Sequence, residues 1–215
     1  MKIFLAQQNY HIGNFEANTA KIIDAIRQAK LQGGDLIVFS ELSVCGYPPR
    51  DFLEFNDFIE QCEKAVDAIR KEADIIAVII GIAHKTLLPT YDIFDEYRYF
   101  EPADSWNVIE FTGKRIALTV CEDIWNLGNN PLYKICPMDK LMEQRPDIMI
   151  NISASPFDYL HAEGRMSMIK QNVAKYKLPM VYCNTVGSQT EIVFDGGSVV
   201  MDTHQNLIAE LPYFA

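Results

Sequence analysis

The chain has 215 residues, enough for one domain with a substantial core. Hydrophobic residues make up 49% and charged residues 22% of it, as in ordinary globular proteins, and no apolar run reaches the roughly 20 residues of a membrane span. The net charge of −10 and the lack of a basic cluster argue against nucleic acid as a partner. The N-terminal apolar run breaks at Gln7-Gln8, too early for a signal peptide. We therefore expect a cytoplasmic protein whose partners are neither membranes nor nucleic acids.

The cysteines are odd in number and widely spaced, and no CxxC pair occurs. This pattern predicts neither a disulfide framework nor a metal site, and it favours reduced thiols in a reducing compartment. Most of them should be small buried side chains. The five are Cys45, Cys62, Cys121, Cys136 and Cys183.

The N-terminal part alternates apolar strands with amphipathic helices. Apolar residues at helical spacing predict the first helix, and Gly33-Gly34 end it. The nearly all-apolar run 35–39 is typical of a strand covered on both faces. In chain order we expect a strand over 2–7, a helix over 15–31, a strand over 35–39, a helix from about Asp51 and a strand over 75–82. The second helix should turn inward Phe55, Phe58, Ile59, Cys62, Val66 and Ile69.

The C-terminal part continues the alternation. Two β-rich runs flank Thr112-Gly113 and predict a hairpin over 107–111 and 114–120. Buried strands that alternate with helices give an α/β protein with helices covering sheets, and without repeats or linkers we expect one domain over 1–215. The further elements expected are a strand over 147–152, a helix over 159–175, a strand over 179–184 and two strands flanking the turn at 204–206.

Reactive side chains follow three of the predicted strands. Glu41 comes after the strand 35–39, Lys85 after 75–82 and Cys121 after 114–120. Functional groups in α/β folds gather beyond the carboxyl ends of strands. If neighbouring strands of one sheet carry these three residues, a carboxylate, an ammonium and a thiol meet in one pocket.

This trio is chemically coherent. A thiol with a pKa of about 8.5 is mostly protonated at neutral pH, so a nucleophilic Cys121 needs a base such as Glu41. The ammonium of Lys85 and the backbone N–H of Glu122 can stabilise an oxyanion, which suits acyl transfer from a carbon–nitrogen bond through a thioester. However, a cysteine ending a buried strand is most often a packed side chain, and a Glu or Lys there is most often a surface charge.

Several longer segments carry a resemblance to a known family. The sequence resembles the nitrilase (carbon–nitrogen hydrolase) superfamily, and within it the glutaminase domain of glutamine-dependent NAD synthetases. The CGYPPRD and FDEYRYF stretches are similar to that branch in particular. The matching segments are GGDLIVFSEL at 33–42, CGYPPRD at 45–51, KTLLPTY at 85–91, FDEYRYF at 94–100, VCEDIW at 120–125 and FDGGS at 194–198.

The resemblance implies a four-layer α-β-β-α sandwich that associates as a homo-oligomer. It implies Glu41 as general base, Lys85 as the group that stabilises the tetrahedral intermediate, and Cys121 as nucleophile, with no cofactor for the hydrolysis of glutamine. The ammonia would pass to a synthetase domain, C-terminal in a longer chain or in a partner. ATP and Mg²⁺ would be needed only there, and no SGGxDS-like motif for such a domain occurs in these 215 residues.

The resemblance also implies contacts for glutamine. Tyr91 would line the pocket, Glu122 would hold the α-ammonium, and Ser153 or Ser155 would bind the substrate. The family often has an arginine for the α-carboxylate where this chain has His161, so Arg165 is the substitute that we consider. Glu96 would support the lysine as a second carboxylate or lie solvated on the surface.

One departure from the family concerns the segment before the lysine. Family members usually carry a hairpin of roughly twenty residues there, whereas Gly81 runs almost directly into Lys85.

The trio and the resemblance together predict glutamine hydrolysis that supplies ammonia for NAD synthesis. Two alternatives stay open: a stand-alone amidase or carbamoyl hydrolase with the same trio, and a non-catalytic scaffold or binding module.

Overall fold

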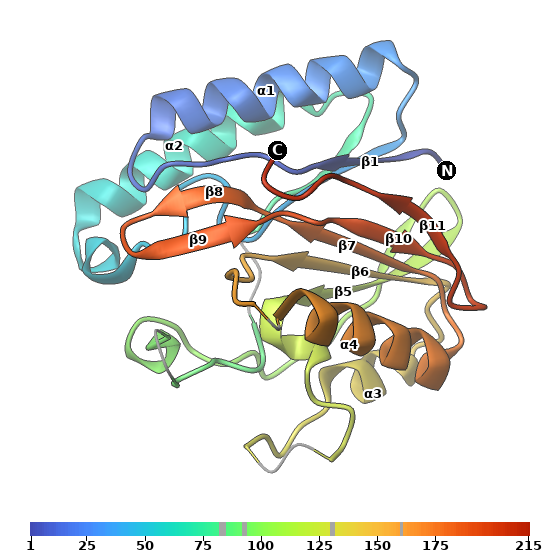
Figure 1. The fold of residues 1–215 in the computed structure, drawn as a ribbon. Helices are drawn as coiled ribbons and strands as arrows, with labels where there is room; N and C mark the ends of the chain where they lie inside the picture. Colours follow the sequence, from blue (N-terminus) through green and yellow to red (C-terminus); the bar gives the residue numbers. More distant parts are fainter. Residues whose placement is uncertain (82–84, 92–93, 130–131, 160) are drawn as a thin grey trace.

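Two β-sheets lie face to face and helices cover the outer face of each (Figure 1). The structure, a computed structural model, describes residues 1–81, 85–91, 94–129, 132–159 and 161–215. One helical layer packs on the first sheet and a second layer packs on the other. The expected four-layer α-β-β-α sandwich is confirmed.

The first sheet is parallel and has the strand order β1-β2-β3. Two helices connect its strands in succession and cover its outer face, as crossovers between parallel strands require. Fully buried apolar residues on these helices, Ile22, Ile26 and Ile69, form the core of that layer. The elements are β1 (Ile3–Ala6), α1 (Phe15–Leu31), β2 (Leu36–Phe39), α2 (Asn56–Glu72) and β3 (Ala77–Ile79).

The second sheet has the order β11-β10-β7-β6-β5-β4, with three parallel strands at its centre and antiparallel strands outside them. Its outer face packs on α3 and α4 through residues such as Met138, Ile169 and Val173. The elements are β4 (Ile109–Phe111), β5 (Lys114–Val120), α3 (Pro137–Met142), β6 (Ile148–Ser153), α4 (His161–Tyr176), β7 (Met180–Asn184), β10 (Val199–Met201) and β11 (Leu207–Glu210).

The inner faces of the two sheets bury one another. Val38 on β2, Ile150 on β6 and Val181 on β7 belong to a single apolar cluster between the sheets. Strands covered on both faces need apolar side chains at nearly every position, which explains the continuous apolar runs in the sequence. This inner cluster fixes the position of one sheet on the other, and with it the strand ends.

The predicted helix over 15–31 and the hairpin around Thr112-Gly113 are confirmed. Asn14 caps the helix by accepting a hydrogen bond from the backbone N–H of Ala17 at 3.2 Å. Thr112 and Gly113 both have positive φ, the conformation that a two-residue hairpin turn requires.

The prediction for the second helix was wrong at its start. A 3₁₀ helix, η1 (Arg50–Glu54), comes first, and α2 begins only at Asn56 because Phe55 is extended. Phe55 and Ile59 therefore point outward, with 56% and 38% of their surface exposed. The sequence reading also missed α3 and a separate hairpin of β8 (Val186–Gln189) and β9 (Ile192–Asp195).

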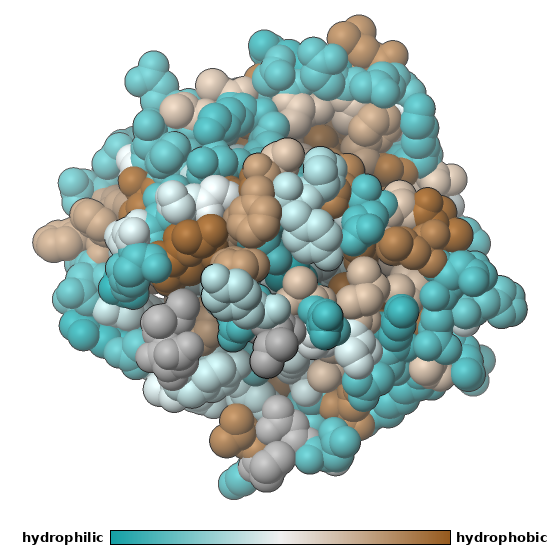
Figure 2. Space-filling view, viewed as in Figure 1, coloured by the Kyte–Doolittle hydropathy of each residue, from teal (hydrophilic) through white to brown (hydrophobic). Residues whose placement is uncertain are grey.

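The surface mixes hydrophilic residues with smaller apolar patches on the face shown in Figure 2. Within the described residues, no helix has both the length and the apolar character that crossing a bilayer demands.

The inner cluster yields a stability prediction. Ile150→Ala removes a fully buried side chain from between the sheets. We expect a loss of about 2–5 kcal/mol in the free energy of unfolding, from lost burial and the remaining cavity. Ile208→Ala on β11 is the control, because Ile208 is 62% exposed and its loss should change stability by less than about 0.5 kcal/mol. Urea unfolding followed by circular dichroism measures both, and equal effects would contradict the assignment of the core.

Candidate active site

The trio expected from the sequence comes from the ends of strands in both sheets. Glu41 follows β2 and Lys85 follows the segment after β3, neighbours in the first sheet, whereas Cys121 follows β5 in the second. The three residues thus do not come from neighbouring strands of one sheet, the condition under which the sequence predicted their meeting. The stacking of the two sheets brings the three ends together. Residues 82–84, which include His84 and the expected end of the third strand, lie outside the described residues.

Lys85 lies between two carboxylates. Its Nζ is 3.3 Å from Oε1 of Glu41 and 2.8 Å from Oε2 of Glu96. Each of these side chains is only 6% exposed. The other oxygen of Glu41 accepts a hydrogen bond from the backbone N–H of Ala154 at 3.0 Å. Burial by itself would lower the pKa of Lys85, but Cys121, Glu41 and Glu96 reverse this, so the pKa is raised and the ammonium stays charged.

Cys121 opens the short 3₁₀ helix η3 (Cys121–Ile124) and has a positive φ of 43°. A non-glycine residue with this backbone conformation is uncommon, and such residues cluster at functional sites. Its thiol is buried, and burial raises the pKa; Glu41 raises it further while Lys85 lowers it. The resting thiol is therefore neutral, and attack on a substrate requires a base that removes the proton.

Asp123 joins the segment that carries Cys121 to the segment that carries Lys85. One of its oxygens accepts hydrogen bonds from the backbone N–H groups of Thr86 and Leu87, each at 2.9 Å, and the other accepts from Val120 at 3.0 Å. Burial raises the pKa of this carboxyl to about 6, while the three backbone donors act in the opposite direction. Asp123 thus holds the residues beside Lys85 against the residues beside Cys121.

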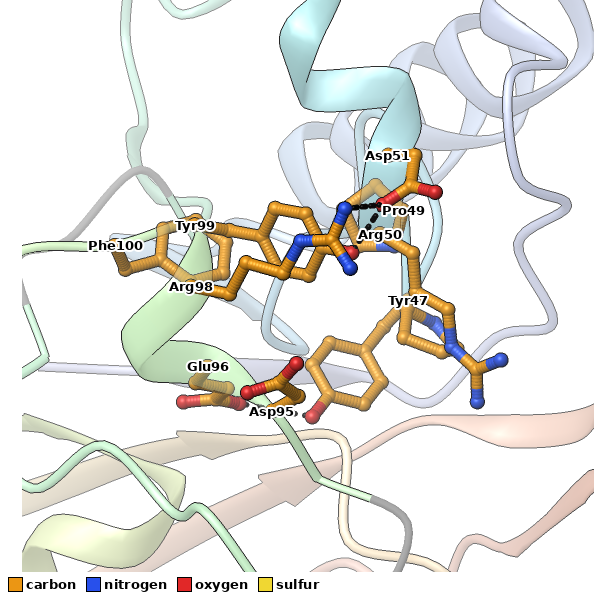
Figure 3. A pocket seen from close by; sticks show the side chains of 10 residues that line it. Tyr47, Pro49, Arg50, Asp51, Asp95, Glu96, Arg98, Tyr99 and Phe100 are labelled. Carbon is orange, nitrogen blue, oxygen red and sulfur yellow. Dashed lines mark hydrogen bonds and ion pairs between the residues drawn. The ribbon is translucent and has the colours of Figure 1, made fainter.

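Glu96 is buried against Lys85 rather than solvated. Burial raises the pKa of Glu96, and the ammonium of Lys85 opposes that rise. Oε1 of Glu96 also accepts a hydrogen bond from the hydroxyl of Tyr47 at 2.8 Å. Both side chains line a surface pocket of about 300 Å³, on whose far side Arg98 pairs with Asp51 (Figure 3).

Glu122 follows Cys121 directly and accepts two phenolic hydrogen bonds on the same oxygen. The hydroxyl groups of Tyr91 and Tyr133 each donate to its Oε1 at 2.9 Å. Glu122 is 7% exposed, and in the described part of the chain no cationic side chain lies within ion-pair distance of it. Burial raises its pKa and the two hydroxyl groups counteract this. A buried carboxylate in this state is suited to a cationic ligand.

The other expected substrate residues lie around Tyr182. Ser153 and Ser155 are buried and their hydroxyl groups interact with that of Tyr182. Arg165 on α4 is buried and pairs with Asp195 at 2.7 Å, while its Nη1 lacks a hydrogen-bond partner among the described residues. The structure therefore places Arg165 in a buried ion pair, without a hydrogen bond or salt bridge to the trio among the residues described.

The remaining cysteines lie away from Lys85. Cys45 is buried in the first helical layer, where it contacts Cys62, and its pKa is raised by that contact and by burial. Cys183 is buried between the sheets. Within the ranges that the structure describes, no three His, Cys, Asp or Glu side chains are grouped as a metal ion would need.

Comparisons with known sequences identify relatives of this chain. The family model for carbon–nitrogen hydrolases matches residues 2–86. A glutamine-dependent NAD(+) synthetase from Synechocystis is 32% identical over 246 residues, which cover 99% of this chain and 44% of the relative. This chain belongs to the carbon–nitrogen hydrolase superfamily. The synthetase of Thermotoga maritima is also 32% identical, over 97% of this chain and 39% of its own length.

Solved structures of the superfamily share the fold. A glutamine-dependent NAD+ synthetase from Acinetobacter baumannii superposes with a TM-score of 0.89 at 30% identity, over 99% of this chain and 43% of its own. An amidase from Nesterenkonia superposes with a TM-score of 0.83 at 19% identity, over 86% of its length, and shows the fold alone. This carbon–nitrogen hydrolase chain thus spans less than half the length of the synthetases that it matches.

Three residues at the site were given no role from the sequence: Tyr47, Asp123 and Tyr133. The first two lie inside the segments CGYPPRD and VCEDIW, so their proximity to the trio could have been inferred from those motifs. Tyr133 lies twelve positions after Cys121 outside any of the matching segments. No spacing in the sequence indicates its contact with Glu122.

The close approach of Gly81 to Glu41 yields a prediction for activity. A Cβ at Gly81 would lie 2.6 Å from the backbone nitrogen of Leu42 and 3.0 Å from Cα of Glu41. Gly81→Ala must therefore displace Glu41, and a shift of about 1 Å can lower the rate about 100-fold. Steady-state amide hydrolysis by the full-length protein measures this. Gly164→Ala is the control, since its Cβ meets nothing within 4 Å; equal rates for both variants would contradict the prediction.

Proposed function

We propose that this chain hydrolyses the side-chain amide of glutamine through a thioester on Cys121. The observation that carries the substrate assignment is the buried Glu122 next to the nucleophile, with one oxygen held by Tyr91 and Tyr133. Its remaining oxygen is available for the α-ammonium of an amino acid. In a hydrolase of uncharged aliphatic amides the substrate would offer this buried carboxylate no cation, and only the two tyrosine hydroxyl groups would offset the cost of burying its charge.

In the first half of the reaction, Glu41 takes the thiol proton as the sulfur of Cys121 attacks the amide carbon. The ammonium of Lys85 and the backbone N–H of Glu122 stabilise the negative charge on the carbonyl oxygen. Glu41 then returns the proton to the amide nitrogen, the carbon–nitrogen bond breaks, and ammonia leaves. Because burial keeps the thiol of Cys121 neutral at rest, proton transfer to Glu41 has to accompany the attack.

In the second half, water attacks the thioester. Glu41 accepts a proton from the water, and the same two donors stabilise the second tetrahedral intermediate. When the carbon–sulfur bond breaks, the proton on Glu41 returns to the sulfur, which releases glutamate and restores the thiol. Glu96 contacts Lys85 and acts by positioning this ammonium. These steps need no cofactor.

The α-carboxylate of glutamine needs partners as well. Ser153, Ser155 and Arg165 are the residues that we propose for it. The buried Nη1 of Arg165, without a hydrogen-bond partner among the described residues, supports this role. The pairing of Arg165 with Asp195 leaves only that part of the guanidinium for a ligand.

The relatives suggest where the ammonia goes. They are named glutamine-dependent NAD(+) synthetases, and this chain covers 44% of the Synechocystis protein. We propose that ammonia from Cys121 is passed to a synthetase domain, in the same chain or in a partner, which uses it for NAD synthesis with ATP and Mg²⁺. A cytoplasmic location and a homo-oligomer accord with this role.

Replacing the nucleophile tests the reaction. Cys121→Ala should abolish glutamate release from glutamine, a loss of at least about 1,000-fold, because no sulfur remains to form the thioester. Cys45→Ala is the matched control and should retain activity, since Cys45 contacts Cys62 rather than Lys85. Mass spectrometry with an electrophilic glutamine analogue should find the adduct on Cys121. Normal turnover by the Cys121 variant would end the proposal, and the absence of any adduct would favour a scaffold.

Replacing Glu122 tests the substrate. Glu122→Gln removes the charge that faces the α-ammonium, and a hydrogen bond to a charged group contributes about 1.5–3 kcal/mol. We expect kcat/KM for glutamine to fall about 10- to 100-fold. Hydrolysis of a second substrate, the analogue of glutamine that lacks the α-amino group, should change little in this variant. A wild-type protein that prefers simple aliphatic amides to glutamine would instead support a stand-alone amidase.

A further inference from the structure

The chain folds back toward the nucleophile after η3. The side-chain amide of Asn126 donates hydrogen bonds to the carbonyl oxygens of Ile135, at 2.7 Å, and Tyr133, at 3.4 Å. These bonds fold the segment that carries Tyr133 back against the residues that follow Cys121. Tyr133 is thereby placed by the same stretch of chain that places the nucleophile.

Tyr91 and Tyr133 reach Glu122 from different segments and bind the same oxygen. Both hydrogen bonds measure 2.9 Å, and both end on Oε1. Two donors from different parts of the chain restrict the rotation of the carboxylate and leave Oε2 for another partner. Burial, followed by the charge of Glu122, raises the pKa of the Tyr133 hydroxyl, so this group stays protonated and acts as a donor at every pH of interest.

We infer that Tyr133 is a specificity-determining residue, which fixes Glu122 through Oε1 so that Oε2 receives the α-ammonium of the substrate. The chemical class selected in this way is an amide that carries a free α-amino group. The inference rests on the proposed function, and it adds a residue that no motif of the chain identifies. Tyr91, which is 44% exposed, supports the same carboxylate from the side nearer to the solvent.

The charges around Glu122 give the inference a signature in pH. Cys121 directly precedes Glu122 in the chain. From the segment after β3, the ammonium of Lys85 lowers the pKa of Glu122 and the carboxylate of Glu96 raises it. The hydroxyl groups of Tyr133 and Tyr91 favour the ionised form of Glu122 by donating hydrogen bonds, whereas burial favours its neutral form. Loss of one hydroxyl raises the pKa of Glu122 further. Because the α-ammonium needs an ionised Glu122, binding then fails at a higher pH than in the wild type.

The test is Tyr133→Phe in the full-length protein, assayed for glutamate release from glutamine and for hydrolysis of the analogue that lacks the α-amino group. We expect KM for glutamine to rise about tenfold, as for the loss of a hydrogen bond to a charged group, with kcat nearly unchanged. The analogue should be hydrolysed as before. The acidic limb of kcat/KM for glutamine should move to higher pH. Tyr97→Phe, which removes a hydroxyl from a residue that is 58% exposed, is the matched control and should leave all these quantities unchanged.

The outcomes separate this inference from the proposed function. A wild-type protein that does not prefer glutamine to the analogue overturns both. A wild type that prefers glutamine, together with an unchanged Tyr133→Phe variant, overturns the inference alone. An equal loss for both substrates without a shift in the pH profile assigns Tyr133 a structural role and also overturns it. A selective loss for glutamine with the shifted acidic limb supports it.

Discussion

A buried ammonium between two carboxylates is the interaction on which the site depends. Lys85 contacts Glu41 and Glu96 where water has little access, and breaking a buried pair by removing one partner typically costs about 3–5 kcal/mol. Two carboxylates for one ammonium leave an excess of negative charge. Burial raises the pKa of Cys121, and the carboxylates of Glu41 and Glu96 raise it further, so the thiol is neutral at rest. The carboxylates that pair with Lys85 therefore also act on the thiol of Cys121.

The fold supplies this interaction by stacking two sheets. Glu41 and Lys85 come from the first sheet, and Cys121 comes from the second, so neither sheet carries the trio alone. The inner apolar cluster determines the relative position of the sheets. Asp123 joins their loops by accepting two backbone hydrogen bonds, from Thr86 and Leu87, while a third, from Val120, holds its carboxylate in place. The inner apolar cluster and the carboxylate of Asp123 together thus align the segments that carry Glu41, Lys85 and Cys121.

Much of the local structure could be predicted from the sequence, because it depends on neighbours in the chain. The capped helix over 15–31 and the hairpin at Thr112-Gly113 are examples. The extended backbone of Phe55 could not be predicted, because the apolar residues around it have helical spacing. Its conformation makes α2 begin only at Asn56. Contacts between distant segments of the chain could not be predicted from the sequence either. The pairing of Arg165 with Asp195 and the bond from Tyr133 to Glu122 depend on tertiary packing that no spacing in the sequence encodes.

The division of the trio between the sheets has a consequence for how the chain matures. Glu41 and Lys85 belong to the first half of the polypeptide, and Cys121 is followed by the strands that complete the second sheet. Glu41 and Cys121 meet only when the two halves dock. In a partly folded chain the thiol therefore has no neighbouring carboxylate from the first sheet, and the site proposed for amide hydrolysis is complete only when the inner faces of the two sheets have buried one another.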